Sequence, residues 1–261
     1  DRTLWVGLSD GSVKGWTAQG DVQIGKADGL MADSIESLFE DREGSLWVGT
    51  STAGLLRIRD GQFRTLTTRD GLPTDLVWSS FRDRKGDMWI GSDQGASQVR
   101  NGEVIRTYNG DDGLLDGFVG AFHETPDGSL WIGCDGGLSR LKNGKLSVYG
   151  VSSGLRNPDI RALAGDGKGG MWIGSHGGGL HHYDGRKIKP VGYGLEQEEV
   201  DALFRDSKGR LWAGDADGPV VIEGEVARRF GVEDGYTGMR VFSFYEDADG
   251  LMWIGTTQGL Y

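Results

Sequence analysis

A tryptophan-centred motif returns at a nearly constant spacing, and this period constrains the fold more than any other feature of the chain. The tryptophans are Trp5, Trp47, Trp89, Trp131, Trp172, Trp212 and Trp253, at intervals of 42, 42, 42, 41, 40 and 41 residues. A glycine stands two positions after each of them, as in GSLWVGT at residues 44–50. A period of this length along all 261 residues predicts a repeat protein without an internal linker.

Each repeat contains four short segments with the character of β-strands, separated by turn signals. In the second repeat we expect the strands at residues 35–41, 45–50, 54–60 and 62–67. Turns such as Asn143-Gly144 suit a tight hairpin between the third and fourth strands. No segment has a sustained helical period, which excludes an α-solenoid. The pattern predicts an all-β fold, namely a β-propeller of four-stranded antiparallel blades.

The number of blades follows from the number of motifs, with one alternative. Seven motifs favour a seven-bladed ring, and we expect residues 1–261 to be a single β-propeller domain. The first repeat lacks its first strand and the last repeat stops near the start of its third, so 26 strands are expected, two fewer than seven full blades need. Six closed blades with a duplicated end are the alternative, as expected for a part of a longer protein.

Charge and composition exclude several classes of function. The net charge is -11 and no run of Lys or Arg occurs, which argues against nucleic acid as a partner. The one cysteine, Cys134, cannot form an internal disulfide. No apolar run is long enough to span a membrane, so we expect membrane attachment only through parts of the parent protein outside this chain. No motif predicts a cofactor, a metal site or a catalytic residue.

Comparison of equivalent positions among the repeats distinguishes positions that keep one type of residue from positions that vary. In the six repeats from the second onward, the position twelve residues before the motif tryptophan is Ile or Val, and the position ten residues before it is Ser or Ala. We expect these two columns to share one face of the innermost strand and to build the blade. The columns eleven and thirteen residues before the tryptophan keep neither size nor charge, and these are the columns in which we expect function.

The variable columns supply most of the candidate ligand-binding residues. They are Glu36, Trp78, Arg161, Asp201 and Phe242 from the first of these columns, Asp159, Glu199 and Arg240 from the second, and His176 from the loop after the fifth motif. Acids, arginines and aromatic rings at one end of the innermost strands suit a polar ligand with flat apolar faces, such as a sugar. Surface variation without a ligand is the alternative. His181 and His182 are adjacent on a strand, so they face opposite ways and cannot join one site.

The repeat unit resembles a known family. The pattern EDxxGxLWIGT, followed by GL, a hairpin turn and a DGL loop, is similar to the two-component regulator propeller repeat along essentially the whole chain. In that family such repeats build the extracytoplasmic sensor region of membrane-bound hybrid histidine kinases and related signalling proteins, whose ligands are commonly carbohydrates. The resemblance implies a periplasmic or extracytoplasmic ligand-sensing propeller, with a small molecule or an oligosaccharide as its ligand. It also implies that any output activity lies outside this chain, and it carries no shared catalytic residues.

Two other functions stay open at this point. An enzyme, such as a propeller lyase or hydrolase, would need a base and an acid at one mouth, for which Glu36, Glu199, Asp201 and His176 are available. A protein-interaction scaffold would use the surface of the blades, and a homodimer is compatible with either reading.

Overall fold

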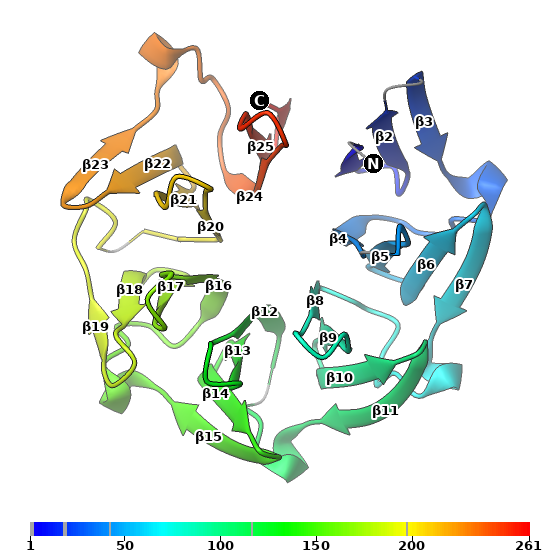
Figure 1. The fold of residues 1–261 in the computed structure, drawn as a ribbon, viewed down its shortest axis with the longest axis horizontal. Coiled ribbons are helices and arrows are strands. Elements are labelled where there is room, and N and C mark those ends of the chain that lie inside the picture. The colour runs from blue at the N-terminus through cyan, green and yellow to red at the C-terminus, as the bar shows by residue number, and fades with distance from the viewer. Residues whose placement is uncertain (1–2, 18–19, 42, 116, 197) are drawn as a thin grey trace. The chain divides into compact units, whose positions relative to one another are not determined.

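The computed structural model describes residues 3–17, 20–41, 43–115, 117–196 and 198–261, which form an all-β fold of 26 strands (Figure 1). Across these residues the strands build seven sheets, five of four strands and two of three. The predicted seven-bladed β-propeller is confirmed, in preference to six blades with a duplicated end. The chain divides into two compact units, Asp1–Phe122 and His123–Tyr261, and each is described by itself.

Three sheets lie wholly within the first unit, and in each of them strands that are consecutive in the chain lie side by side. The first sheet has β1 (Leu4–Gly7), β2 (Val13–Thr17) and β3 (Gly20–Ile24). The second has β4 (Ile35–Glu40), β5 (Leu46–Thr50), β6 (Leu55–Arg59) and β7 (Gln62–Leu66). The third has β8 (Ser79–Arg82), β9 (Met88–Ser92), β10 (Gly95–Arg100) and β11 (Glu103–Tyr108). The strands of the second repeat therefore begin and end within one residue of their predicted positions.

The remaining sheets belong to the second unit, except that Val119–Phe122 of one of them are part of the first. The division between the units falls inside β12 (Val119–Glu124), which is followed by β13 (Leu130–Cys134), β14 (Gly137–Lys142) and β15 (Lys145–Tyr149). The next sheet has β16 (Ile160–Gly165), β17 (Met171–Ser175), β18 (Gly179–Tyr183) and β19 (Ile188–Pro190). Then come β20 (Ala202–Arg205), β21 (Leu211–Asp215), β22 (Gly218–Glu223) and β23 (Val226–Arg229). The last sheet has β24 (Val241–Glu246), β25 (Met252–Thr256) and β26 (Gly259–Leu260).

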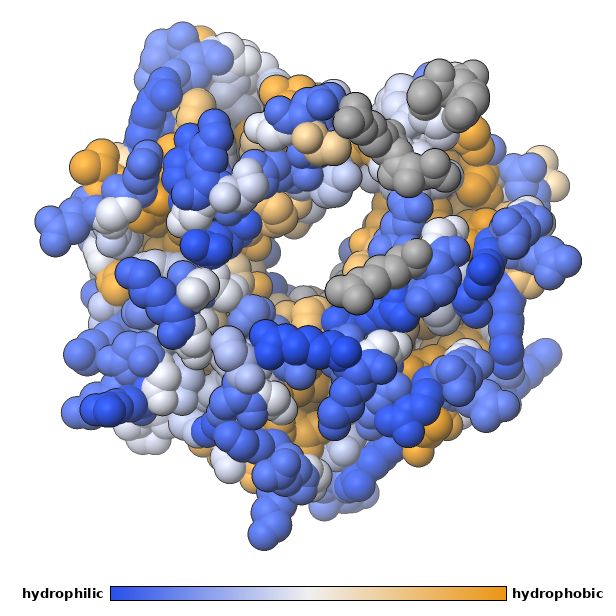
Figure 2. Space-filling view, in the orientation of Figure 1, coloured by the Kyte–Doolittle hydropathy of each residue, from blue (hydrophilic) through white to orange (hydrophobic). Residues whose placement is uncertain are grey.

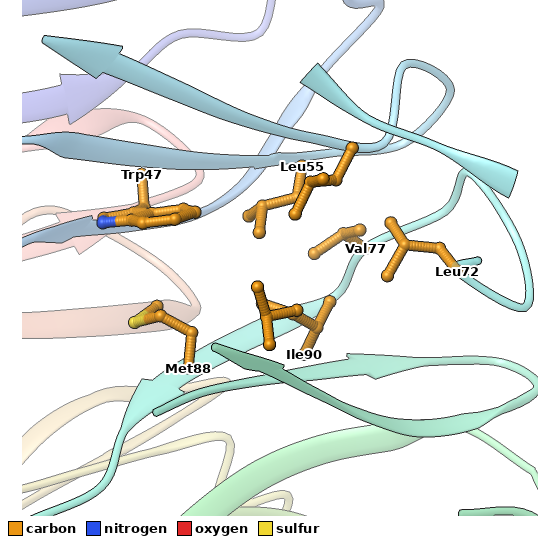
Figure 3. Packing of buried hydrophobic residues seen from close by; sticks show 8 residues of the cluster. Trp47, Leu55, Leu72, Val77, Met88 and Ile90 are labelled. Carbon is orange, nitrogen blue, oxygen red and sulfur yellow. The ribbon is translucent and has the colours of Figure 1, made fainter. Parts of the chain in front are cut away.

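The strand that carries the tryptophan motif is buried between neighbouring sheets. Every residue of β5, β9, β13 and β21 is buried. In the first unit, one apolar cluster joins two sheets (Figure 3), and it includes Trp47, Leu55, Val77, Met88 and Ile90. Hydrophilic residues instead cover most of the surface in view in Figure 2, as the net charge of -11 leads one to expect. The motif therefore builds the packing between sheets and is not itself a candidate site.

The glycine two positions after the tryptophan is required by the close approach of the next sheet. A Cβ atom on Gly91 would lie 2.5 Å from the carbonyl oxygen of Val119, and one on Gly174 would lie 2.6 Å from that of Val200. Both distances are far below van der Waals contact, so a larger residue would push the neighbouring sheet away. The glycine column sets how tightly successive sheets stack.

The innermost strands contain an irregularity that the sequence pattern did not reveal. Ile35 pairs with Thr50, but Ser37 pairs with Gly49, so Glu36 occupies a β-bulge. The same register shift occurs around Arg161 and around Phe242. Because a bulge reverses the alternation of side chains, the columns ten and twelve residues before the tryptophan lie on opposite faces. Our expectation that they share a face is wrong, and the bulged residue between them is the one whose identity varies.

An aspartate six residues before the tryptophan joins the turn to the motif. Oδ1 of Asp41 accepts hydrogen bonds from the backbone N–H groups of Glu43, at 3.0 Å, and Ser45, at 2.8 Å. Its Oδ2 accepts one from Nε1 of Trp47 at 2.8 Å. The equivalent indole bonds to Asp83, Asp206 and Asp247 measure 3.0, 3.0 and 2.9 Å. One carboxylate thus accepts hydrogen bonds from the backbone N–H groups of the turn and from the N–H of the buried indole. This explains the aspartate of the Asp-x-x-Gly pattern before the tryptophan.

The DGL loops form single turns of 3₁₀-helix, which we did not predict. At residues 68–70, Asp70 accepts a hydrogen bond from the backbone N–H of Thr67 at 2.9 Å, and Gly71 ends the turn at a φ of 100°. This left-handed conformation favours glycine, and the leucine that follows, Leu72, is buried. In the part of the chain that the structure describes, the helices are turns of three residues, and none is long and apolar enough to cross a membrane.

Candidate ligand-binding site

Seven of the nine candidate residues lie in the second unit, at the starts of its innermost strands and in one loop. They are Asp159 and Arg161 at β16, His176 after β17, Glu199 and Asp201 before β20, and Arg240 and Phe242 at β24. The other two, Glu36 in β4 and Trp78 before β8, belong to the first unit. Within the second unit β16 contacts β20, and β20 contacts β24, so residues from three successive sheets meet.

Arg240 joins two carboxylates of the preceding sheet. Its Nη2 lies 2.7 Å from Oε2 of Glu199, and its Nε lies 2.6 Å from Oδ2 of Asp201. The hydrogen bond to Asp201 is the largest cause that raises the pKa of Arg240 above its usual value. The side chain of Arg240 is 33% exposed, so a ligand can still reach it. The pair of acids and the arginine form a preorganised polar surface.

His176 extends this group of charges toward the sheet before it. Its Nε2 lies 3.1 Å from Oε1 of Glu199, and its Nδ1 lies 3.9 Å from Oδ1 of Asp201. The backbone N–H of His176 also donates to the carbonyl oxygen of Asp159 at 2.9 Å, which fixes the loop. The imidazole side chain is 38% exposed, so it belongs to the accessible surface of the site.

Arg161 and Asp159 form the next part of the same surface. Nε of Arg161 lies 2.7 Å from Oδ1 of Asp159, and Nη2 lies 2.8 Å from Oδ2. Asp135, in the preceding sheet's loop, lies 3.6 Å from Nη2 of the same arginine. Because Arg161 is the bulged residue of its strand, the bulge accounts for its departure from the ordinary alternation. We refer to Asp135, Asp159, Arg161, His176, Glu199, Asp201 and Arg240 as the charged network.

The charged network has the chemistry to bind a ligand rich in hydroxyl groups. Carboxylate oxygens accept hydrogen bonds from hydroxyls, and guanidinium groups donate to them. Phe242, two residues after Arg240, is 56% exposed and presents a flat apolar ring to solvent. Among the described residues no group of three or more His, Cys, Asp or Glu side chains is placed to hold a metal ion. The network is therefore suited to polar recognition by side chains.

The two candidates of the first unit form a different kind of surface. Trp78 packs edge-on against Phe118, with ring centroids 5.1 Å apart and an interplanar angle of 69°. Glu36 accepts a short hydrogen bond from the hydroxyl of Ser34. Glu36 and Trp78 come from separate sheets of the first unit. Trp78 forms an aromatic contact and Glu36 a hydrogen bond, and the two are not joined by ion pairs like those of the charged network.

The two adjacent histidines face opposite ways, as their positions on one strand predicted. His182 lies 2.9 Å from Oδ2 of Asp166, whereas His181 is fully buried and its Nε2 accepts a hydrogen bond from the backbone N–H of Arg156 at 2.9 Å. Burial lowers the pKa of His181 from 6.5 to about 4.

His181 should therefore make stability depend on pH. Between pH 6.5 and about 4, His181 binds a proton more readily in the unfolded chain than in the folded chain. The stability that the neutral, buried His181 contributes is therefore fully present above pH 6.5 and is lost as the pH falls toward 4. The loss should amount to about 3 kcal/mol. The variant His181→Leu copies Leu56, which stands at the same position of another sheet. We expect its free energy of unfolding, measured with urea at several pH values, to change less between pH 6.5 and 4 than that of the wild type. An unchanged slope in the variant would contradict this assignment.

Two features of the second unit escaped the sequence reasoning. Glu199 and Arg240 occupy the same column of successive repeats, and this alone signals that they are neighbours when sheets stack. Asp215 is fully buried and pairs with Arg229, with Nη1 at 2.7 Å and Nη2 at 2.6 Å from its two oxygens. The sequence does contain a signal for this pair. Three residues after the motif tryptophan, Asp215 stands where the other repeats from the second onward have Ser, Thr or Cys.

Comparison with known proteins identifies the repeat. A sequence model of the family described as two component regulator propeller matches residues 29–52, 71–94, 113–136, 154–177 and 235–258. The chain belongs to the two component regulator propeller family. Each segment that matches contains one tryptophan motif, and the regulator propeller repeat of Trp212, with Glu199, Asp201 and Asp215, lies outside the matched segments.

Solved structures of signalling proteins share the fold of this regulator propeller. The extracellular domain of the hybrid two component system BT3049 from B. thetaiotaomicron aligns with a TM-score of 0.83 and 17% identity, over 99% of this chain and 38% of that one. The extracellular domain of the one component system BT4673 from the same organism aligns with a TM-score of 0.82 and 20% identity, over 99% of this chain and 36% of that one. The chain thus spans less than two-fifths of these relatives.

An enzyme shares the fold as well. Virginiamycin B lyase from Staphylococcus aureus aligns with a TM-score of 0.80 and 12% identity, over 100% of this chain and 90% of that one. No curated protein matches the sequence. At these identities the likeness shows the fold alone, and the function has to be argued from the residues of the site.

Proposed function

We propose that this regulator propeller is a ligand-sensing part of an extracytoplasmic bacterial signalling receptor, and that it binds a saccharide at the charged network. The observation that carries the proposal is the contact of Arg240 with both Glu199 and Asp201, which joins variable positions of two successive sheets. Positions that vary among otherwise regular repeats are free of the requirements of the fold. Their convergence on one partly exposed surface supports a role in recognition.

The likeness to extracellular domains of signalling proteins supports the sensor role and its extracytoplasmic location. The membership of the regulator propeller family supports it independently. The kinase or other output of the receptor would be carried by other parts of the parent protein.

The network would recognise a saccharide through its hydroxyl groups and one face of its ring. Glu199 and Asp201 would accept hydrogen bonds from hydroxyls, and the exposed parts of Arg161 and Arg240 would donate to them. Phe242 would pack against an apolar face of the sugar. Since the ligand would contact three sheets at once, its binding would favour one arrangement of those sheets over others, which is the physical requirement for a signal.

The proposal is tested by a thermal-shift screen followed by titration calorimetry. The probes are neutral oligosaccharides, including cellotriose, xylotriose, mannotriose and arabinotriose, and a ligand of the folded state raises the melting temperature. We expect Arg161→Gln and Arg240→Gln each to weaken the binding of the stabilising saccharide at least about tenfold, because each removes charge-assisted hydrogen bonds.

Arg228→Gln is the matched control for these variants. Arg228 is in β23 of the same unit, pairs with Asp234 and is 59% exposed, but it does not belong to the network. Its variant should bind the saccharide as the wild type does. Equal affinity in all three variants, or no rise in melting temperature with any of the probes, would show that the proposed site is wrong.

An enzymatic function rests on one specific observation, the position of His176 beside Glu199 and Asp201. A neutral imidazole next to a carboxylate can accept a proton from a bound substrate. Incubation of the stabilising saccharide with the protein, followed by mass spectrometry of the saccharide, separates the two functions. We expect the saccharide to be recovered unchanged, whereas its conversion by the wild type but not by His176→Ala would establish an enzyme.

A further inference from the structure

A cleft lies in the second unit, between the outer parts of two sheets, and its lining residues are not those of the charged network. It has a volume of about 390 Å³, and its lining includes Tyr149, Ser152, Ser153, Tyr183, Arg186 and Lys187. None of these residues belongs to the charged network. The volume falls within the range of small-molecule sites, and the cleft mixes aromatic rings, hydroxyls and cationic groups.

The aromatic part of the cleft is built around a buried tryptophan. Trp131 is fully buried, and its ring centroid lies 5.2 Å from that of Tyr149 and 4.7 Å from that of Tyr183. Tyr183 pairs with Met171 at a position that holds Trp16 in the first sheet and Ile58, Val99, Leu141 and Ile222 in four others. The tyrosine therefore differs from the aliphatic residues of the two neighbouring sheets, Leu141 and Ile222, at the place where the cleft forms.

The hairpin between β18 and β19 holds the two cationic groups in place. Oδ1 of Asp184 accepts hydrogen bonds from the backbone N–H groups of Arg186 and Lys187, both at 2.9 Å. These two bonds are the largest causes that lower the pKa of the Asp184 carboxyl. Arg186 stands at the turn position that holds Gly61, Gly102 and Gly144 in three other hairpins. The carboxylate fixes the turn, and the turn directs two cations to the edge of the cleft.

Both cationic side chains are available to a ligand. Arg186 and Lys187 are exposed, and within the described residues neither forms an ion pair. By contrast Arg100, Arg210 and Arg229 are paired with buried aspartates. In a chain with a net charge of -11, two free cations at a cleft produce a local attraction for anions that the protein as a whole does not have.

We propose that this cleft binds an acidic saccharide. Its carboxylate or other acid group would pair with Arg186 and Lys187, its ring would lie against the tyrosines, and its hydroxyls would bond to Ser152 and Ser153. The site differs from the charged network in its residues and in the charge of the ligand it selects. A failure of this proposal leaves the proposed function of the network untouched, and the reverse also holds.

Titration of the whole chain with glucuronate, with glucose as the neutral probe, tests the proposal. We expect glucuronate to bind more tightly than glucose, and Arg186→Gln combined with Lys187→Gln to weaken glucuronate binding at least about tenfold. The matched control is Lys85→Gln combined with Lys208→Gln, which removes the same charge from exposed turn positions of sheets that do not line the cleft.

The control should bind glucuronate within about twofold of the wild type, because exposed charges at a distance are screened by salt. The proposal is overturned if glucuronate binds no more tightly than glucose, or if the cleft variant and its control weaken binding equally.

Discussion

Replacing Trp131 by alanine should lower the free energy of unfolding by about 3 to 5 kcal/mol. Trp131 is fully buried, its ring contacts those of Tyr149 and Tyr183, and its Nε1 donates a hydrogen bond to the hydroxyl of Thr125 at 3.2 Å. Its removal leaves a cavity lined by two aromatic rings and also leaves the hydroxyl without that donor. Urea unfolding followed by circular dichroism measures the loss.

Trp16→Ala provides the control for the tryptophan prediction. Trp16 is 36% exposed, and the ammonium group of Lys14 lies 4.7 Å from its ring centroid. Its replacement should lower the free energy of unfolding by less than about 1 kcal/mol, because no closed cavity forms. Losses of the same size in the two variants would mean that the motif tryptophans do not carry the packing between sheets.

The replacement of Asp215 by alanine is expected to have the second largest effect, about 2 to 4 kcal/mol of unfolding free energy. Asp215 is fully buried, and its two oxygens bind Nη1 and Nη2 of Arg229 at 2.7 and 2.6 Å. The hydrogen bond to Asp215 is the largest cause that raises the pKa of Arg229. Without the aspartate the guanidinium loses its partner, although 35% exposure of the side chain lets water offset part of the cost.

Two further variants separate this explanation from a general loss of packing. Asp21→Ala breaks the pair with Lys14, in which the aspartate side chain is 56% exposed, and should change stability by less than about 1 kcal/mol. Asp215→Thr combined with Arg229→Thr copies the residues of the second repeat, Thr50 and Thr65, and should regain at least half of the lost stability. A double variant as unstable as Asp215→Ala would refute the role assigned to the pair.

The fold was predictable because each structural position occurs several times in one sequence, so that residues required by the fold can be recognised by their recurrence. The tryptophan, the glycine two positions after it and the turn aspartate recur, and each has one physical task in every sheet where the structure shows it. The strand limits of the second repeat followed from hydrophobic alternation and turn residues. The bulge at Glu36 was not predictable in this way, because an alternating pattern of Ile35 and Ser37 looks the same with or without a shift in register.

The candidate site was predictable in composition but not in its pairings. Variable columns pointed to Arg161, Glu199, Asp201 and Arg240, yet the sequence did not say which acids meet which arginine. The partners of Arg240 are 39 and 41 residues away, close to one repeat, so the spacing of the repeats could have indicated them. The contacts of His176 depend on the path of a loop, which no periodicity describes.

Hydrogen–deuterium exchange with and without the saccharide that gives the largest thermal shift tests the central claim most directly. The claim is that positions where the repeats disagree form the binding surface, whereas the tryptophan motif only builds the fold. We expect binding to slow amide exchange at residues 159–161, 176, 199–201 and 240–242, with no selective change in the motif strands. Protection that spares all four of these segments, or that is confined to the motif strands, would contradict the account.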